Sequence, residues 1–246
     1  VLFGGHTLYG LASDVWSLSL TDPSNWQQLT PDPSPTVVQR YGHTGIFDPV
    51  RHELVTFGGH KATWVFGHDF SGIANGGRTN EVCRMDLGAS PSWRLANTPA
   101  LQSYSVAFDP VARDVLMFSG LRAALRSSIE YDGDLHAMRL SDADPHWTTV
   151  LTSGAMPSPR NGHQAVWDGT RDRMLVFGGV YAVNLNDLWE YRPRPAPTWT
   201  QLLPAGSPPL PRQGFGMVLD ADRDRLLIFG GIAGYPSGNP ANDLWE

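Results

Sequence analysis

The chain has 246 residues, of which 26 are glycine and 20 are proline. Because both residue types interrupt helices, this composition argues against a helical bundle and against a coiled coil. A hydrophobic content of 41% with 17% charged residues indicates a folded globular chain, and the net charge of −6 gives no sign of a nucleic-acid partner. No apolar run approaches the roughly 20 residues that a membrane-spanning helix needs, so we expect no membrane insertion.

A Phe-Gly-Gly element recurs along the chain and marks an internal repeat. Four copies are complete and one reads Phe-Ser-Gly, and their Phe residues are Phe3, Phe57, Phe118, Phe177 and Phe229. In each copy after the first, an Asp at the end of an apolar stretch lies nine residues before the Phe, namely Asp48, Asp109, Asp168 and Asp220. We expect this Asp to cap a tight turn between two strands with its own side chain.

Three further elements complete the repeat. Arg-x-Gly precedes the Asp in three copies, at Arg40, Arg160 and Arg212, whereas Leu101 stands at this position in the remaining one. After the Gly pair, an acidic residue opens another strand, as in Asp187-Leu188-Trp189. A later strand carries a Trp, namely Trp26, Trp93, Trp147 or Trp199. We name the four predicted strands A (between the Arg and the Asp), B (Phe-Gly-Gly), C (acidic residue) and D (late Trp).

Four short strands in a unit of about 50 residues match the kelch period, and the pattern resembles the kelch family over essentially the whole chain. The resemblance implies an all-β kelch β-propeller of four-stranded blades, with about five blades represented and the first and last incomplete. We expect one propeller over residues 1–246, with blade segments 1–31, 32–98, 99–154, 155–206 and 207–246. The Gly pair would let backbones approach where blades crowd, and the Trp would supply an apolar plate for the neighbouring blade.

The ends of the chain and its basic residues bear on its source. The chain begins inside a predicted B strand and stops inside a predicted C strand, so we expect it to be an excerpt of a longer protein. Lys61 is the one lysine beside many arginines, which is typical of a bacterial protein from a GC-rich genome. By resemblance alone, a secreted or cell-surface location is favoured.

The resemblance also implies a binding face, formed by the B–C loops and the D–A connections. Arg40, Arg160 and Arg212 would ring one mouth of the central channel, where guanidinium groups could bind a carboxylate or phosphate. The alternative is that each Arg holds a loop or a carbonyl group of its own blade. The B–C loops, which differ most between blades, add Tyr9, His60, Trp64, His68, Arg78, Arg122, Arg126, Tyr181 and Tyr235 as candidate contacts. His43 and His163, which we place within A strands, are expected to be structural.

Metal and enzyme chemistry receive less support from the sequence. His60, His68 and Asp69 have ligand types that suit a transition metal, but no rigid spacing supports a site, so we expect neither a metal nor another cofactor. The segment 220–224 resembles the start of a calcium loop but lacks its Gly and its bidentate Glu, which favours a turn. Galactose oxidase is a kelch-fold enzyme with a copper site and a Cys–Tyr crosslink, but no Tyr and His set maps onto that site, so Cys83 is expected to be a half-buried structural residue.

We therefore predict a non-enzymatic binding or scaffold module that recognises a protein or peptide with acidic groups on this face. Two alternatives stay open. One is a carbohydrate-binding propeller that uses the loop aromatics. The other is a kelch-fold enzyme of the oxidase or sugar-mutarotase type, with its site partly outside this chain.

Overall fold

The computed structural model describes most of the chain, and the regular structure of the described residues is β. The described residues are 1–7, 10–19, 21–22, 24–29, 40–41, 43–61, 81–88, 92–97, 101–102, 104–122, 130–142, 145–234 and 238–246. Within these ranges the strands pair in an antiparallel manner, and no helix is long and apolar enough to cross a membrane. The chain divides into two compact units, Val1–Gln102 and Ser103–Glu246.

The first unit contains two main sheets. Strands β1 (Leu2–Thr7), β2 (Gly10–Leu18) and β3 (Trp26–Leu29) form the first sheet, which we call blade one. Blade two has the order β5 (Thr44–Asp48), β6 (Glu53–Phe57), β8 (Glu81–Asp86) and β9 (Ser92–Asn97). The short strands β4 (Arg40–Tyr41) and β7 (His60–Lys61) pair with each other, and β10 (Leu101–Gln102) ends the unit.

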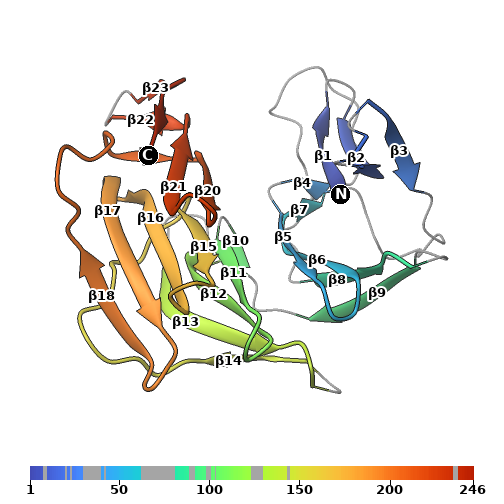
Figure 1. The fold of residues 1–246 in the computed structure, drawn as a ribbon, viewed down its shortest axis with the longest axis horizontal. Helices are drawn as coiled ribbons and strands as arrows, with labels where there is room; N and C mark the ends of the chain where they lie inside the picture. The colour runs from blue at the N-terminus through green and yellow to red at the C-terminus, as the bar shows by residue number, and fades with distance from the viewer. Residues whose placement is uncertain are drawn as a thin grey trace. The chain divides into compact units, whose positions relative to one another are not determined.

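The second unit contains three further blades, which follow one another in Figure 1. Blade three consists of β11 (Ser105–Asp109), β12 (Asp114–Arg122), β13 (Tyr131–Arg139) and β14 (Trp147–Thr149). Blade four has the order β15 (Gln164–Asp168), β16 (Arg173–Tyr181), β17 (Val183–Arg192) and β18 (Thr198–Leu202). Blade five combines the sheet β20 (Gly216–Asp220), β21 (Arg225–Phe229) and β24 (Leu244–Trp245) with the sheet β19 (Arg212–Gln213), β22 (Ile232–Ala233) and β23 (Asn239–Pro240).

Apolar side chains fill the space between consecutive blades. Phe3 of blade one packs with Met85 of blade two. Between blades three and four, Phe118 and Leu135 meet Val176, Trp189 and other residues in the largest described cluster. Because both faces of a blade are covered, β16 is buried along most of its length, which explains its nearly continuous apolar sequence.

The Trp of strand D takes two different positions. Trp199 on β18 is 1% exposed and its ring centroid lies 4.9 Å from that of Phe118 in blade three, as the sequence predicts. Trp26 on β3 is 51% exposed, so the prediction of an inter-blade plate is wrong for this residue. Trp26 lies on β3, an edge strand of the sheet β1–β2–β3, where three of the four residues are exposed.

The turn between strands A and B is built in the same way in four blades. The final Asp of strand A accepts hydrogen bonds from backbone N–H groups of the turn, as predicted, in Asp48, Asp109, Asp168 and Asp220. Four residues later, a non-glycine residue adopts a φ between 53° and 60°, namely His52, Arg113, Asp172 or Asp224. Because Asp220 accepts from the N–H of Arg223, the segment 220–224 is a turn, as the sequence analysis favoured.

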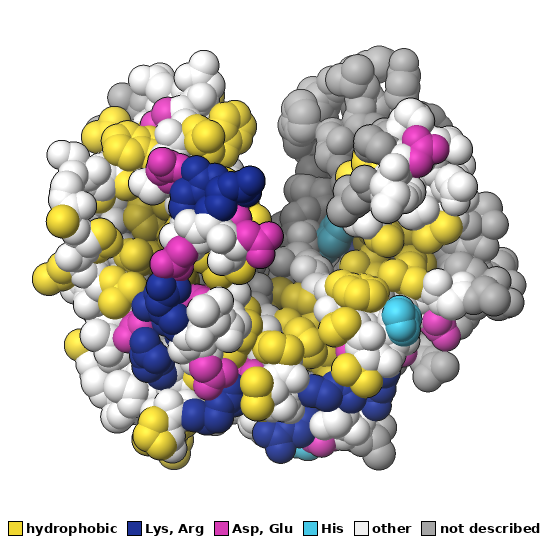
Figure 2. Space-filling model, viewed as in Figure 1, with side chains coloured by type: hydrophobic (Ala, Val, Ile, Leu, Met, Phe, Trp, Pro, Cys, Tyr) yellow, Lys and Arg dark blue, Asp and Glu magenta, His cyan; other side chains and the backbone are white. Residues whose placement is uncertain are grey.

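Oppositely charged side chains alternate along one face of the second unit, and some of their ion pairs join consecutive blades (Figure 2). Arg171 of blade four donates to Asp224 of blade five at 2.6 and 2.7 Å. Arg194 of blade four donates to Asp109 of blade three at 2.8 and 3.3 Å, and also binds Asp172. Arg171 and Asp224 lie in the A–B turns of blades four and five, whereas Arg194 lies in the connection between β17 and β18 and reaches the end of β11.

Candidate functional site

The three predicted channel arginines are buried inside their own blades. Arg40, Arg160 and Arg212 are each 0% exposed. In each case Nη1 donates a hydrogen bond to the carbonyl oxygen of the first residue of the Gly pair 18 residues later: Gly58 at 3.2 Å, Gly178 at 3.1 Å and Gly230 at 2.9 Å. This geometry matches the alternative in which each Arg holds a carbonyl group of its own blade.

Two of these arginines also bind the acidic residue that opens strand C. Arg160 donates to both carboxylate oxygens of Asp187 at 2.6 and 2.9 Å. Burial alone would raise the pKa of Asp187, but the hydrogen bonds from Arg160 hold it below its usual range. The indole nitrogen of Trp189 donates to the same carboxylate at 2.6 Å.

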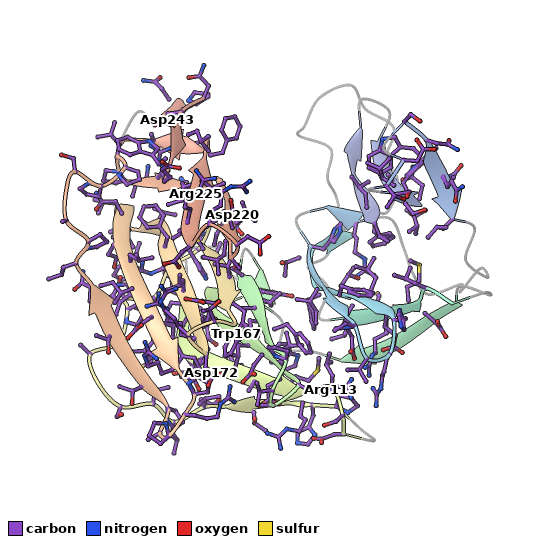
Figure 3. All side chains as sticks on the ribbon, viewed as in Figure 1. Arg113, Trp167, Asp172, Asp220, Arg225 and Asp243 are labelled. Atoms are coloured by element: carbon purple, nitrogen blue, oxygen red, sulfur yellow. The ribbon has the colours of Figure 1, made fainter. Side chains whose placement is uncertain are left out.

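Blade five repeats this arrangement. Arg212 donates to Asp243, which is labelled in Figure 3, at 2.6 and 2.8 Å, and Trp245 donates to the same carboxylate. The hydrogen bonds from Arg212 lower the pKa of Asp243. Since both guanidinium groups already have a carboxylate partner, an acidic ligand would have to displace Asp187 or Asp243. The sequence contains a signal for these pairs, because the Arg and the Asp recur at fixed positions of the repeat.

The two histidines that follow Arg-x-Gly each lie one residue before strand A and not within it, and each packs its ring on the neighbouring blade. His43 packs on Phe3 with ring centroids 5.2 Å apart, and His163 packs on Phe118 at 5.6 Å. Burial lowers the pKa of His163 to about 3, and the charge of Arg160 acts in the same direction. His163 is therefore uncharged at neutral pH.

Tyr181 is the predicted contact residue whose side chain the structure describes at the B–C end. It is 44% exposed at the end of β16. Its ring meets that of Tyr131, at the start of β13, edge to face with centroids 5.1 Å apart. Burial raises the pKa of Tyr131, with a smaller contribution from Tyr181. We call Tyr131 and Tyr181 the tyrosine pair. Tyr131 was missed in the sequence because its neighbour belongs to the next blade.

The other predicted contacts have no described side chain. His60 lies in β7 and Arg122 ends β12, and both are placed by their backbone. Tyr9, Trp64, His68, Arg78, Arg126 and Tyr235 lie outside the described residues, as does Asp69 of the weighed metal site. Cys83 on β8 is fully buried, which is deeper than the half-buried position expected from the sequence.

A comparison with protein families identifies the repeat. The model described as the KLHDC2/KLHL20/DRC7 Kelch-repeats domain matches residues 105–246, which is more than half of the chain. The chain belongs to the kelch-repeat family. Its fold is accordingly the all-β kelch propeller type that the sequence predicted, built of antiparallel blades with strand A at one edge and strand D at the other.

Several curated proteins contain segments similar to this kelch chain. Rho GTPase-activating protein gacHH of Dictyostelium discoideum is 30% identical over 134 residues, which cover 54% of this chain and 8% of that protein. Host cell factor 2 of Homo sapiens is 34% identical over 89 residues, which cover 35% and 11%. Host cell factor of Drosophila melanogaster is 26% identical over 157 residues, which cover 59% and 10%. The kelch chain thus spans about a tenth of the length of these relatives.

A solved structure extends the likeness of fold to nearly the whole chain. The structure of YjhT matches with a TM-score of 0.67 and 14% sequence identity, and the match covers 98% of this chain and 76% of that one. At this identity the likeness concerns the fold.

Proposed function

We propose that this kelch chain is a protein-interaction module that binds a peptide segment of its partner at the B–C end of the blades, with the tyrosine pair as an anchor. The observation that carries the proposal is the edge-to-face contact between Tyr131 and the exposed Tyr181, which joins two neighbouring blades at that end. Tyrosine is enriched at binding hot spots because it offers a large apolar area together with a polar tip. Kelch relatives such as the host cell factors are consistent with an interaction role.

The tyrosine pair is suited to binding because its two side chains would lose little conformational entropy when a ligand binds. Each ring already restricts the other, and Tyr131 is anchored by its pairing with Leu121 on β12. Val183, 46% exposed, extends the apolar surface beyond Tyr181. An apolar or aromatic side chain of a peptide could therefore bury area against a surface that is already ordered.

The preference for an acidic partner is a separate part of the proposal. It does not rest on Arg160 or Arg212, because their charges are balanced by Asp187 and Asp243. It rests on Arg78, Arg122 and Arg126 in the sequence of the B–C loops. Binding that depends on these arginines would weaken as salt concentration rises, whereas binding that depends on the tyrosine pair would change little.

Selection from a displayed random-peptide library, using the full chain as the target, tests the proposal. We expect the selected peptides to bind at least about 10-fold more weakly to the Tyr181→Ala variant, because the loss of a hot-spot aromatic typically exceeds 1 kcal/mol. Affinities of synthetic copies of the peptides would be measured by fluorescence anisotropy.

Trp26→Ala is the matched control, because Trp26 is also an exposed aromatic residue but lies on strand D. Equal affinity for wild type and Tyr181→Ala, with loss in Trp26→Ala, would move the binding site to strand D and contradict the proposal. A glycan array probed with the same protein examines the carbohydrate alternative, which predicts glycan binding that is insensitive to salt and lost in Trp64→Ala or Tyr235→Ala.

A further inference from the structure

Blade three lacks the arginine that neutralises the acidic residue of strand C in blades four and five. Leu101 stands at the position of Arg160 and Arg212, yet Asp134 keeps the position of Asp187 and Asp243. Asp134 is exposed, and within the described part of the chain its carboxylate binds no basic side chain. Blade three therefore keeps the acidic residue at the start of strand C but has no arginine at the position that pairs with it in blades four and five.

Two other substitutions in the same strand add ligand groups beside Asp134. In blade four, the residues two before and two after Asp187 are Leu185 and Trp189. In blade three, the corresponding residues are Asp132 and His136. Asp132, Asp134 and His136 all lie on β13, whose pairing with β12 shifts register between Asp132 and Leu135, as in a β-bulge. One ligand atom from each of the three lies within 4.8 Å of the others.

The imidazole of His136 is held in a defined orientation. It is 8% exposed, its Nδ1 lies 3.3 Å from the hydroxyl of Thr149 on β14, and its Nε2 lies 3.3 Å from a carboxylate oxygen of Asp132. Asp132 is 3% exposed, and the same oxygen accepts a hydrogen bond from the backbone N–H of Asp134 at 2.8 Å. Nε2 of His136 and a carboxylate oxygen of Asp132 thus face each other. In the tautomer in which Nδ1 carries the proton and donates to Thr149, both atoms offer lone pairs that could bind the same cation.

We propose that Asp132, Asp134 and His136 bind a divalent first-row transition-metal ion, which replaces in blade three the guanidinium group of blades four and five. One nitrogen and two carboxylate groups suit Zn²⁺ or Mn²⁺, whereas Ca²⁺ and Mg²⁺ prefer sites made of oxygen ligands alone. The hydrogen bond between Nδ1 and Thr149 would fix the orientation of the ring, as ligating histidines commonly require. Three protein ligands leave at least one position for water, on the side where Asp134 is exposed.

Isothermal titration of the metal-stripped full chain with ZnCl₂ tests the site. We expect one equivalent of zinc to bind to wild type, and to bind at least about 10-fold more weakly to Asp134→Asn. Asp134 is the residue to change because its exposed side chain can be altered without disturbing the packing, which circular dichroism in EDTA would verify. Zinc should also raise the Tm of wild type and leave that of Asp134→Asn unchanged.

His146→Gln is the matched control, because His146 is an exposed histidine in the same blade, and it should bind zinc as wild type does. A folded wild type that binds no zinc overturns the proposal. Zinc binding that survives Asp134→Asn but disappears in His68→Gln also overturns it, since the ion would then lie in the B–C loop of blade two. Equal affinity for CaCl₂ would overturn the assigned class of metal.

Discussion

At the scale of single residues, the ring that follows Arg-x-Gly connects neighbouring blades. His43, His163 and Phe215 each pack on the Phe-Gly-Gly phenylalanine of the preceding blade, and Phe215 meets Phe177 with centroids 5.5 Å apart. Phe215 and His163 thus occupy equivalent positions and pack in the same way, although one ring is apolar and the other can be protonated. The histidine must stay neutral to do so, because burial and Arg160 lower its pKa to about 3.

His163 should make the free energy of unfolding depend on pH. Its pKa in the folded state is lowered, so the unfolded chain takes up a proton as pH falls through about 6.5, while the folded chain does not until about pH 3. This residue should therefore reduce stability by up to about 1.4 kcal/mol per pH unit across that window, and by about 2 kcal/mol between pH 6.5 and 5. His163→Phe, which copies Phe215, should remove this part of the dependence in urea titrations at each pH.

The difference between wild type and His163→Phe is the informative quantity, because carboxylates also titrate in this range. Parallel stability curves for the two proteins between pH 6.5 and 5 would show that the imidazole accepts a proton in the folded state, contrary to this prediction. His146→Phe makes the same substitution at an exposed position of the same unit and serves as the comparison variant.

At the scale of secondary-structure elements, the Gly pair forms the junction between strands B and the next blade. A Cβ on Gly178 would lie 3.0 Å from the carbonyl oxygen of Arg212 in blade five, and a Cβ on Gly4 would lie 3.1 Å from that of Arg40 in blade two. In blade three, Ser119 takes the first position at a φ of 53°. Its hydroxyl accepts from the backbone N–H of Arg160 at 2.7 Å, and its one proton has two acceptors, the carbonyl oxygen of Asp132 at 2.6 Å and that of Arg160 at 2.9 Å. Ser119 thus makes hydrogen bonds to the main chain at this junction.

The second glycine of the pair lets us separate crowding from backbone strain. Gly179 and Gly206 have the same φ of 95°, but a Cβ on Gly179 would lie 2.7 Å from the carbonyl oxygen of Asn161, whereas a Cβ on Gly206 has nothing within 4 Å. We expect Gly206→Ala to cost about 1 kcal/mol, from the backbone alone, and Gly179→Ala to cost about 3 kcal/mol or more. Equal losses in chemical denaturation would show that the close approach is not what requires glycine.

At the scale of the whole molecule, ion pairs between blades add to the apolar cores, and their value depends on the burial of the carboxylate. Arg194 and Arg171 have similarly exposed side chains, at 36% and 38%. Arg194 binds Asp109, whose side chain is 2% exposed, whereas Arg171 binds Asp224, whose side chain is 64% exposed. Asp168 is the other partner of Arg171, and its ion pair with Arg173 would remain when Arg171 is replaced.

Arg194→Gln should therefore destabilise the protein by about 1–2 kcal/mol, because it removes an ionic partner from a buried carboxylate. Arg171→Gln should leave the thermal midpoint close to that of wild type, because water can solvate the exposed carboxylate of Asp224 once the guanidinium group is removed. Differential scanning calorimetry of both variants checks the prediction. A larger loss in Arg171→Gln would indicate that the exposed pair, and not the buried carboxylate, holds the blades together.

The strands and turns could be predicted from the sequence because their signals are local. Apolar alternation and the capping Asp lie within a few residues of each other, and the repeat multiplies each signal. Side-chain partners were harder to predict. Arg160 binds Asp187, which is 27 residues away, and Tyr131 meets Tyr181 across two blades, so both contacts depend on strand register and blade packing.

The junction made by Ser119 and by the first glycines has a consequence for how such a chain can change over evolution. Its contacts with the next blade include main-chain atoms of whichever residue occupies the Arg position, as with Arg160 and Arg212. A contact to the main chain places no demand on side-chain identity in the neighbouring repeat. Duplicating, deleting or reordering whole repeats would thus preserve this junction, while stacked rings such as His163 and Phe118 would have to be matched again after each rearrangement.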